Sequence, residues 1–265
     1  MELAHGVCYR DGGDGCVWSG CKGIDEMKVR GGKTVYGASV GILMLEAQFP
    51  RIPGDMGNAL SWDFPVHYRV VRSASPDLVV RQGAKGTLPL FIDAAKDLVA
   101  NGVDGITTNC GFLSLFQGEL AAAVDVPVAA SSLMQVGMVN ALLPPGKRCG
   151  ILTISDSSLT QAHLVAAGVP EGTPIGSTEG LREFTRAILG NDLELDVDAA
   201  RQDNIDAAVL LAQANPDMGA LVLECTNMVP YAADIREAIG LPVFSIHSFV
   251  GWFQAGLTPR RFNPV

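Results

Sequence analysis

The chain has 265 residues and a formal net charge of −9, and 48% of its residues are hydrophobic. A chain of this length can bury a full core, either as one large α/β domain or as two lobes. Its acidic balance and its lack of a Lys/Arg cluster argue against nucleic-acid and anionic-membrane partners. The longest apolar runs, such as 40–45, are far shorter than the roughly 20 residues of a transmembrane helix.

The N-terminal segment has neither a targeting pattern nor a folding pattern. Arg10, Asp11 and Asp14 interrupt any apolar stretch, so we expect no secretory leader and a cytoplasmic protein. Residues 1–34 are rich in glycine and charge and show no periodicity, which predicts a poorly ordered extension. It contains Cys8, Cys16 and Cys21, for which we expect free thiols in that compartment.

The folded part is predicted to begin with a buried strand at 38–45, an apolar run of the kind found in parallel sheets. Residues 46–58 contain two prolines and two glycines, which exclude regular structure. Loops at the carboxyl ends of parallel strands build the sites of open α/β sheets. We therefore regard Arg51, Asp55 and Asn58 as candidates for substrate contact.

Strands and helices then alternate along the rest of the chain. The first half continues with strands at 67–72, near Ile106 and near Val128, and with helices at 88–101 and 112–124. The second half has predicted strands at 150–154, 220–223 and 243–246, and helices at 157–167, 178–189, 198–215, 229–239 and 248–255. This alternation predicts parallel sheets with right-handed crossovers.

A break at 144–146, Pro-Pro-Gly, separates the two halves. We predict an α/β fold of two pseudo-symmetric lobes, each a mainly parallel sheet flanked by helices. The lobes would span 35–146 and 147–265, and a crossover of the C-terminal helix onto the first lobe is compatible with this division.

The two halves share a repeat that is centred on a cysteine. The segment that ends in Cys110 aligns with the segment that ends in Cys225 at an offset of 225 − 110 = 115 residues. A Pro-Val pair follows each cysteine after the same interval, since 127 − 110 = 17 and 242 − 225 = 17. This register indicates a duplicated strand, loop, helix and strand. A pseudo-twofold axis would bring the two thiols face to face.

Each of these cysteines ends an apolar strand and precedes a predicted helix. The positive end of a helix dipole lowers a thiol pKa and attracts a carboxylate, so we expect a depressed pKa for Cys110, for Cys225 or for both. Their neighbours offer backbone N–H groups, a hydroxyl and amides: Asn109, Gly111, Thr226 and Asn227.

Two matched thiols suit acid–base chemistry on the opposite faces of one carbon. One thiolate would remove a proton while the other thiol delivers one, which inverts the centre. For both sulfurs to reach that carbon, they should lie about 7 Å apart, too far for a disulfide. No Cys-x-x-Cys occurs and the four histidines are scattered, so we expect no zinc site.

Several segments resemble the aspartate/glutamate/hydantoin racemase superfamily: Thr-Asn-Cys-Gly around Cys110, Glu-Cys-Thr-Asn around Cys225, and Gly-Ile-Leu-Thr-Ile-Ser from Gly150. The resemblance covers about residues 38–257. It implies two α/β lobes, chemistry without PLP or metal, and Cys110 and Cys225 as the catalytic acid and base. It also implies that Asn109, Gly111, Thr226 and Asn227 hold the substrate carboxylate. Further binding candidates are Asn58, Ser131, Ser132, Ser155 and Ser157.

The chain also departs from glutamate racemases, which have a histidine where Asn227 stands. We predict a cofactor-independent racemase or epimerase of a small acidic amino acid or related carboxylate, and a homodimer as among the relatives. Two alternatives stay open. One is a maleate-type cis–trans isomerase with a nucleophilic cysteine. The other is a non-enzymatic ligand-binding or redox sensor protein.

Overall fold

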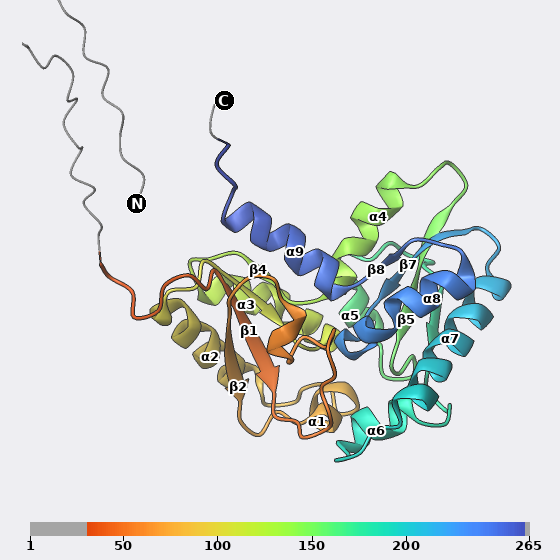
Figure 1. The fold of residues 1–265 in the computed structure, drawn as a ribbon, viewed down its shortest axis with the longest axis horizontal. Coiled ribbons are helices and arrows are strands. Elements are labelled where there is room, and N and C mark those ends of the chain that lie inside the picture. Colours follow the sequence, from red (N-terminus) through yellow and green to blue (C-terminus); the bar gives the residue numbers. More distant parts are fainter. Residues whose placement is uncertain (1–30, 263–265) are drawn as a thin grey trace, which may run out of the picture. The chain divides into compact units, whose positions relative to one another are not determined.

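A computed structural model describes residues 31–262, which contain two four-stranded sheets (Figure 1). The first sheet has the order β2 (Val66–Val71), β1 (Val40–Leu45), β3 (Gly105–Thr108) and β4 (Val128–Ala129). The second has the order β6 (Ile175–Ser177), β5 (Arg148–Thr153), β7 (Met218–Leu223) and β8 (Val243–Phe244). All neighbouring strands are parallel, which confirms the predicted fold class.

Helices flank both sheets. The α-helices are α1 (Pro76–Val80), α2 (Leu88–Asn101), α3 (Gln117–Ala123), α4 (Val136–Leu142), α5 (Gln161–Ala166), α6 (Phe184–Gly190), α7 (Val197–Ala214), α8 (Ala232–Ile239) and α9 (Ile246–Leu257). Within residues 31–262, four 3₁₀ helices accompany them: η1 (Ala59–Ser61), η2 (Gly111–Phe116), η3 (Ser132–Gln135) and η4 (Thr226–Tyr231). In Figure 1, α2 and α3 lie beside the first sheet, and α7 and α8 lie beside the second.

The predicted repeat is present at the level of strand register. Ile106 of β3 pairs with Val128 of β4, and Leu221 of β7 pairs with Val243 of β8. The offset is the same in both strands, since 106 + 115 = 221 and 128 + 115 = 243. The 3₁₀ helices η2 and η4 follow the same offset, because 111 + 115 = 226. The two thiol-bearing corners are therefore built alike.

Local sequence explains the best-predicted elements. All six residues of β1 are buried, as expected of an apolar strand in a parallel sheet. The α2 helix has a proline in its first turn and ends at Gly102, whose φ of 105° suits glycine. It buries Phe91, Ala95 and Leu98 against the sheet. Its predicted bounds of 88–101 are confirmed.

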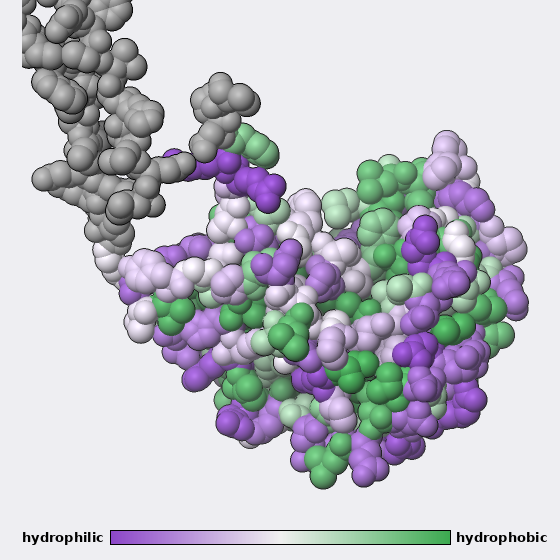
Figure 2. All heavy atoms as spheres, in the orientation of Figure 1, coloured by the Kyte–Doolittle hydropathy of each residue, from purple (hydrophilic) through white to green (hydrophobic). Residues whose placement is uncertain are grey.

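Two helices pack against the sheet that does not precede them in the chain. The α4 helix follows β4 but contacts β5, whereas α9 follows β8 but contacts β3. Phe253 and Leu257 of α9 lie so close to Gly105 that an added Cβ would come within 2.7 Å of each. The α4 helix also exposes Met138 and Leu142, and Figure 2 shows hydrophobic colour over this helix.

Other expectations differ from the structure. The stretch 112–124 is not one α-helix but η2 followed by α3, and its counterpart is η4 followed by α8. Pro230 lies inside η4, where it has no N–H to donate. The predicted extension lies, up to residue 30, outside the described residues. Within 31–262, no helix is both long and apolar enough to cross a bilayer.

Asp203 fixes the start of α6 and gives the first test of this packing. Its fully buried carboxylate accepts hydrogen bonds from the backbone N–H groups of Glu183 at 2.6 Å and Phe184 at 2.9 Å. Asp203→Ala would leave these donors unpaired, so we expect urea unfolding to show a loss of about 3 kcal/mol. Asp203→Asn retains one acceptor and should lose less; equal stability of both variants and the wild type would contradict this role.

Candidate functional site

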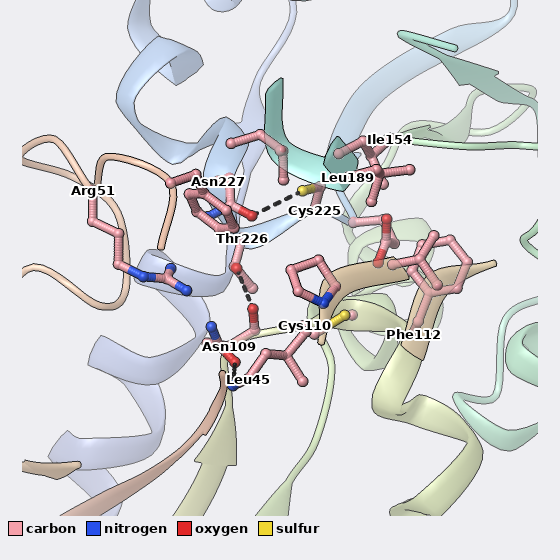
Figure 3. Close-up of a pocket in the computed structure, with 16 residues that line it drawn as sticks. Leu45, Arg51, Asn109, Cys110, Phe112, Ile154, Leu189, Cys225, Thr226 and Asn227 are labelled. Atoms are coloured by element: carbon pink, nitrogen blue, oxygen red, sulfur yellow. Dashed lines mark hydrogen bonds between the residues drawn. The ribbon is translucent and has the colours of Figure 1, made fainter. Parts of the chain in front are cut away.

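The two thiols meet in one pocket. Cys110 follows β3 and Cys225 follows β7, and each precedes the first turn of a 3₁₀ helix. Figure 3 shows both sulfur atoms among the residues that line the pocket. The lining residues come from both halves: Leu45, Phe49, Arg51, Pro76, Val80, Asn109, Cys110, Gly111, Phe112, Ile154, Ile188, Leu189, Glu224, Cys225, Thr226 and Asn227. The predicted convergence of the two corners is therefore observed.

Both cysteines are free thiols, 8% and 7% exposed, so the expectation that they are not bonded to each other is confirmed. The expectation of a depressed pKa is wrong for this structure. Burial raises the pKa of both thiols, and the neighbouring Glu224 carboxylate raises them further. The helix-dipole argument ignored the cost of placing a thiolate in a site with little water.

The two thiols have different surroundings. Backbone N–H groups of Phe112 and Leu113 and the positive charge of Arg51 partly offset the rise in the pKa of Cys110. Cys225 donates a hydrogen bond to the side-chain oxygen of Asn227 at 3.6 Å; the backbone N–H of Asn227 opposes the rise in the pKa of Cys225, and the Asp55 carboxylate adds to that rise. The nearby charges differ: Arg51 favours a thiolate on Cys110, whereas Asp55 disfavours a thiolate on Cys225.

The loop after β1 delivers a positive charge to the pocket. Arg51 pairs with the buried Asp55 at 2.8 Å, and its guanidinium carbon lies 4.6 Å from the centre of the Phe49 ring. Asn227 donates its amide N–H to the other oxygen of Asp55, which turns the Asn227 oxygen toward Cys225. Among the described residues, Asp55 is the only hydrogen-bond partner of the Arg51 guanidinium, which leaves N–H groups for an anionic ligand.

The residues that flank each thiol contact those that flank the other. The Thr226 hydroxyl donates to the carbonyl oxygen of Asn109 at 2.6 Å. The pseudo-symmetric contact joins Gly111 and Glu224, since 111 + 115 = 226 and 109 + 115 = 224. A Cβ atom on Gly111 would overlap the Glu224 side-chain oxygen Oε1, so only glycine fits there. These crossed contacts hold the two thiol corners together.

Glu224 is a third titratable group in the pocket. Its Oε2 accepts a hydrogen bond from the Thr153 hydroxyl at 2.7 Å, but its buried Oε1 has no partner among the described residues. Burial raises the pKa of Glu224 to about 7, and the hydrogen bonds from Thr153 and from the backbone of Ile154 oppose that rise. An acid with this pKa changes charge near neutral pH.

Apolar side chains close the pocket. Phe49 and Val80 from the first half face Ile188 and Leu189 from the second, and the remaining cavity is about 20 Å³, room for about one water molecule. Beside this closure, the backbone N–H of Gln48 donates to the Asn191 side chain at 2.7 Å. A substrate larger than a water molecule therefore needs a wider pocket than this one.

The sequence predicted some lining residues and missed others. Asn109, Gly111, Thr226 and Asn227 line the pocket as expected, and so does Arg51. Phe49, Leu189 and Glu224 had not been predicted. The signal for Glu224 was its place in the repeat opposite Asn109, immediately before a cysteine.

The remaining candidates do not line the pocket; they make hydrogen bonds within the loops, turns and strand ends around it. Asn58 donates to the Arg51 carbonyl at 2.9 Å, and Ser132 donates to the Leu223 carbonyl at 2.7 Å. Ser131 caps η3, whereas Ser155 and Ser157 donate to Glu179 at 3.0 and 2.7 Å.

Comparison with known proteins identifies relatives of this chain. No family model matches it. A dimethylsulfoniopropionate lyase from Durusdinium sp. clade D is 28% identical over 240 residues, which cover 85% of this chain and 77% of that protein. Dimethylsulfoniopropionate lyase 7 of Emiliania huxleyi is 31% identical over 234 residues, covering 83% of this chain and 67% of the lyase. The chain belongs to the dimethylsulfoniopropionate lyase family.

Solved structures agree on the fold. Arylmalonate decarboxylase matches with a TM-score of 0.55 at 15% identity, over 85% of this chain and 95% of its own. Glutamate racemase from Bacillus anthracis matches with a TM-score of 0.55 at 13% identity, over 83% and 81%. The predicted fold of the aspartate/glutamate/hydantoin racemase superfamily is confirmed. The relatives are named lyases, however, whereas the sequence predicted an isomerase.

Glu224 gives a prediction about stability and pH. Its pKa rises from the ordinary glutamate value of 4.5 to about 7 in the folded protein. The folded state therefore binds this proton more tightly than the unfolded state. The stability that results is fully present below pH 4.5 and is lost progressively, by about 3 kcal/mol, as the pH rises to about 7. We therefore expect Glu224→Gln to gain stability relative to the wild type between pH 5 and pH 8 in urea unfolding. The exposed Glu119→Gln is the matched control; the same pH dependence in all three proteins would contradict the raised pKa.

Proposed function

We propose that this protein cleaves dimethylsulfoniopropionate to dimethyl sulfide and acrylate. Two facts support the proposal. The chain belongs to a family whose members bear this activity in their names, and its pocket joins two thiols, which suit proton removal, with an arginine, which suits a carboxylate. The choice of dimethylsulfoniopropionate as the substrate rests on the family relationship.

The reaction needs one base and one anion site. A thiolate removes a proton from C2, the carbon next to the substrate carboxylate. The C–H electron pair forms the C2–C3 double bond while the C3–S bond breaks and its electron pair stays on sulfur. Neutral dimethyl sulfide and acrylate leave, and the proton passes from the thiol to solvent. Atoms and charge balance without a cofactor.

Arg51 is the residue that we assign to the substrate carboxylate. Asp55 and the Phe49 ring hold the guanidinium in place, and its remaining N–H groups form the planar fork that suits two carboxylate oxygens. Negative charge develops on these oxygens as the C2 proton leaves. A fixed positive charge there stabilises the transition state more than the ground state.

Cys110 is the base that its surroundings favour. Two backbone N–H groups and Arg51 support its thiolate, whereas Cys225 has one such N–H group, lies near the Asp55 carboxylate and donates a hydrogen bond to Asn227. Both thiols have raised pKa values in the protein alone. A sulfonium ion beside them would lower these pKa values, because a positive charge favours the thiolate. The substrate itself would then help to form the base.

Racemisation of a small acidic amino acid is the second candidate. The arrangement that favours it is the pair of thiols in one pocket, since a lyase needs one base whereas inversion of a carbon needs a base and an acid. Chiral chromatography after incubation with single enantiomers of aspartate and glutamate separates the two proposals. Inversion without acrylate formation from dimethylsulfoniopropionate would favour the racemase.

The lyase proposal predicts the effect of removing the base. Purified wild-type protein should release acrylate and dimethyl sulfide from dimethylsulfoniopropionate, as followed by NMR. Cys110→Ala should lower kcat by roughly 10²- to 10⁴-fold, and Cys225→Ala by less. The buried Cys149→Ala is the matched control, because Cys149 does not line the pocket. Full activity of Cys110→Ala would overturn the assignment.

A further inference from the structure

The role of Glu224 becomes clear from its pseudo-symmetric partner. Asn109 accepts a hydrogen bond from the backbone N–H of Leu45, the last residue of β1, at 2.7 Å. Glu224 accepts one from the hydroxyl of Thr153, the last residue of β5, also at 2.7 Å. In the first half, the acceptor at the strand end is a neutral amide and its donor is a backbone N–H rather than a hydroxyl. The fold therefore needs an acceptor at this point but not a negative charge.

The second carboxylate oxygen is left for another purpose. Glu224 is 1% exposed and lines the pocket, and its Oε1 has no hydrogen-bond partner among the described residues. That oxygen lies against Gly111, which has no side chain to cover it. An oxygen buried this deeply without a protein partner needs one from the pocket, either a water molecule or a ligand.

In the protein without substrate, the charge of Glu224 also opposes formation of the thiolate that the proposed reaction needs. Its carboxylate raises the pKa of both Cys110 and Cys225, which disfavours the thiolate. Within residues 31–262, no Lys, Arg or His forms an ion pair with Glu224. A ligand with a positive charge would both give the Glu224 carboxylate a partner and offset its effect on the thiol pKa.

The pocket is polarised in a way that suits such a ligand. In Figure 3, Arg51 and Phe112 lie on opposite sides of the two cysteines. Glu224 contacts Gly111, the residue before Phe112, and so belongs to the side away from Arg51. At one end of the pocket, the Arg51 guanidinium is paired with Asp55 but has N–H groups left for an anionic group of a ligand. The other end offers a carboxylate and an aromatic ring, both of which attract an organic cation.

We propose that the Glu224 carboxylate is the counter-ion for an onium group of the substrate, so that the pocket selects zwitterions with a carboxylate at the Arg51 end. This inference rests on the proposed function, since it assigns a residue to the sulfonium group of that substrate. A sulfonium or quaternary ammonium ion has no N–H to donate, so it is bound by charge and by contact with apolar surface. A carboxylate next to phenylalanine supplies both.

Two ligands of the same shape test the proposal. In 3-(trimethylammonio)propionate and 4,4-dimethylpentanoate the carboxylate and the three methyl groups are alike, and only the central atom differs, N⁺ or carbon. Calorimetric titration at pH 8, where Glu224 is ionised, gives a Kd for each. Glu224→Gln retains the acceptor for Thr153, as Asn109 does in the other half. Glu119→Gln is the control, because Glu119 is exposed on α3.

We expect the wild type and Glu119→Gln to bind the ammonium ligand more tightly than the neutral one. Glu224→Gln should weaken binding of the ammonium ligand about tenfold or more, while the Kd of the neutral ligand changes less than about twofold. Equal losses for both ligands, or no loss for the ammonium ligand, would overturn the proposal. So would a wild type that does not prefer the cation.

This test separates the inference from the proposed function. Affinity is measured without turnover, so a protein that fails to release acrylate can still show the charge preference; the lyase proposal alone would then fail. Conversely, an active lyase whose KM for dimethylsulfoniopropionate is unchanged in Glu224→Gln would retain its function and lose the assignment of Glu224.

Discussion

The site depends on the crossed contact between the two thiol corners. The Thr226 hydroxyl binds the Asn109 carbonyl, and the Glu224 side chain packs on Gly111, so each residue that precedes a cysteine touches the residue that follows the other. A chain in which one unit is duplicated can meet itself in this way only about a pseudo-twofold axis. The same contacts that join the halves bring both thiols to one pocket. Fold and chemistry therefore share a single set of interactions.

The two halves differ in sequence around the pocket, so the two ends of the pocket differ in charge. The corresponding positions hold Asn109 and Glu224, which each accept a hydrogen bond from a strand end, from a backbone N–H and from a hydroxyl respectively, but differ in charge. The loop after β1 brings Arg51 to one half of the pocket. The outcome is a cavity with a positive end and an acidic end, and with a thiol from each half between them. Such a cavity suits a small molecule that itself carries both charges.

The sequence predicted the frame well because periodicity and spacing report directly on strands and repeats. The offset of 115 residues between Cys110 and Cys225 reappears in the strand register. Burial was not visible to the same reasoning, so the thiol pKa was predicted in the wrong direction. Glu224 was missed for the same reason, since a glutamate before a cysteine has meaning only once its oxygen is known to be buried and unpaired. Ser155 and Ser157 stand at a strand end as expected, but Glu179 binds both.

The most direct test of the account asks whether the C2–H bond of the substrate breaks in the step that releases acrylate. Acrylate release would be followed in single turnovers, where chemistry rather than product release is observed, from dimethylsulfoniopropionate with deuterium at C2 or at C3. The account predicts severalfold slower release from the C2-deuterated substrate, because a thiolate removes the C2 proton. Equal rates from the C2-deuterated and ordinary substrates, with slower release only from the C3-deuterated one, would contradict it.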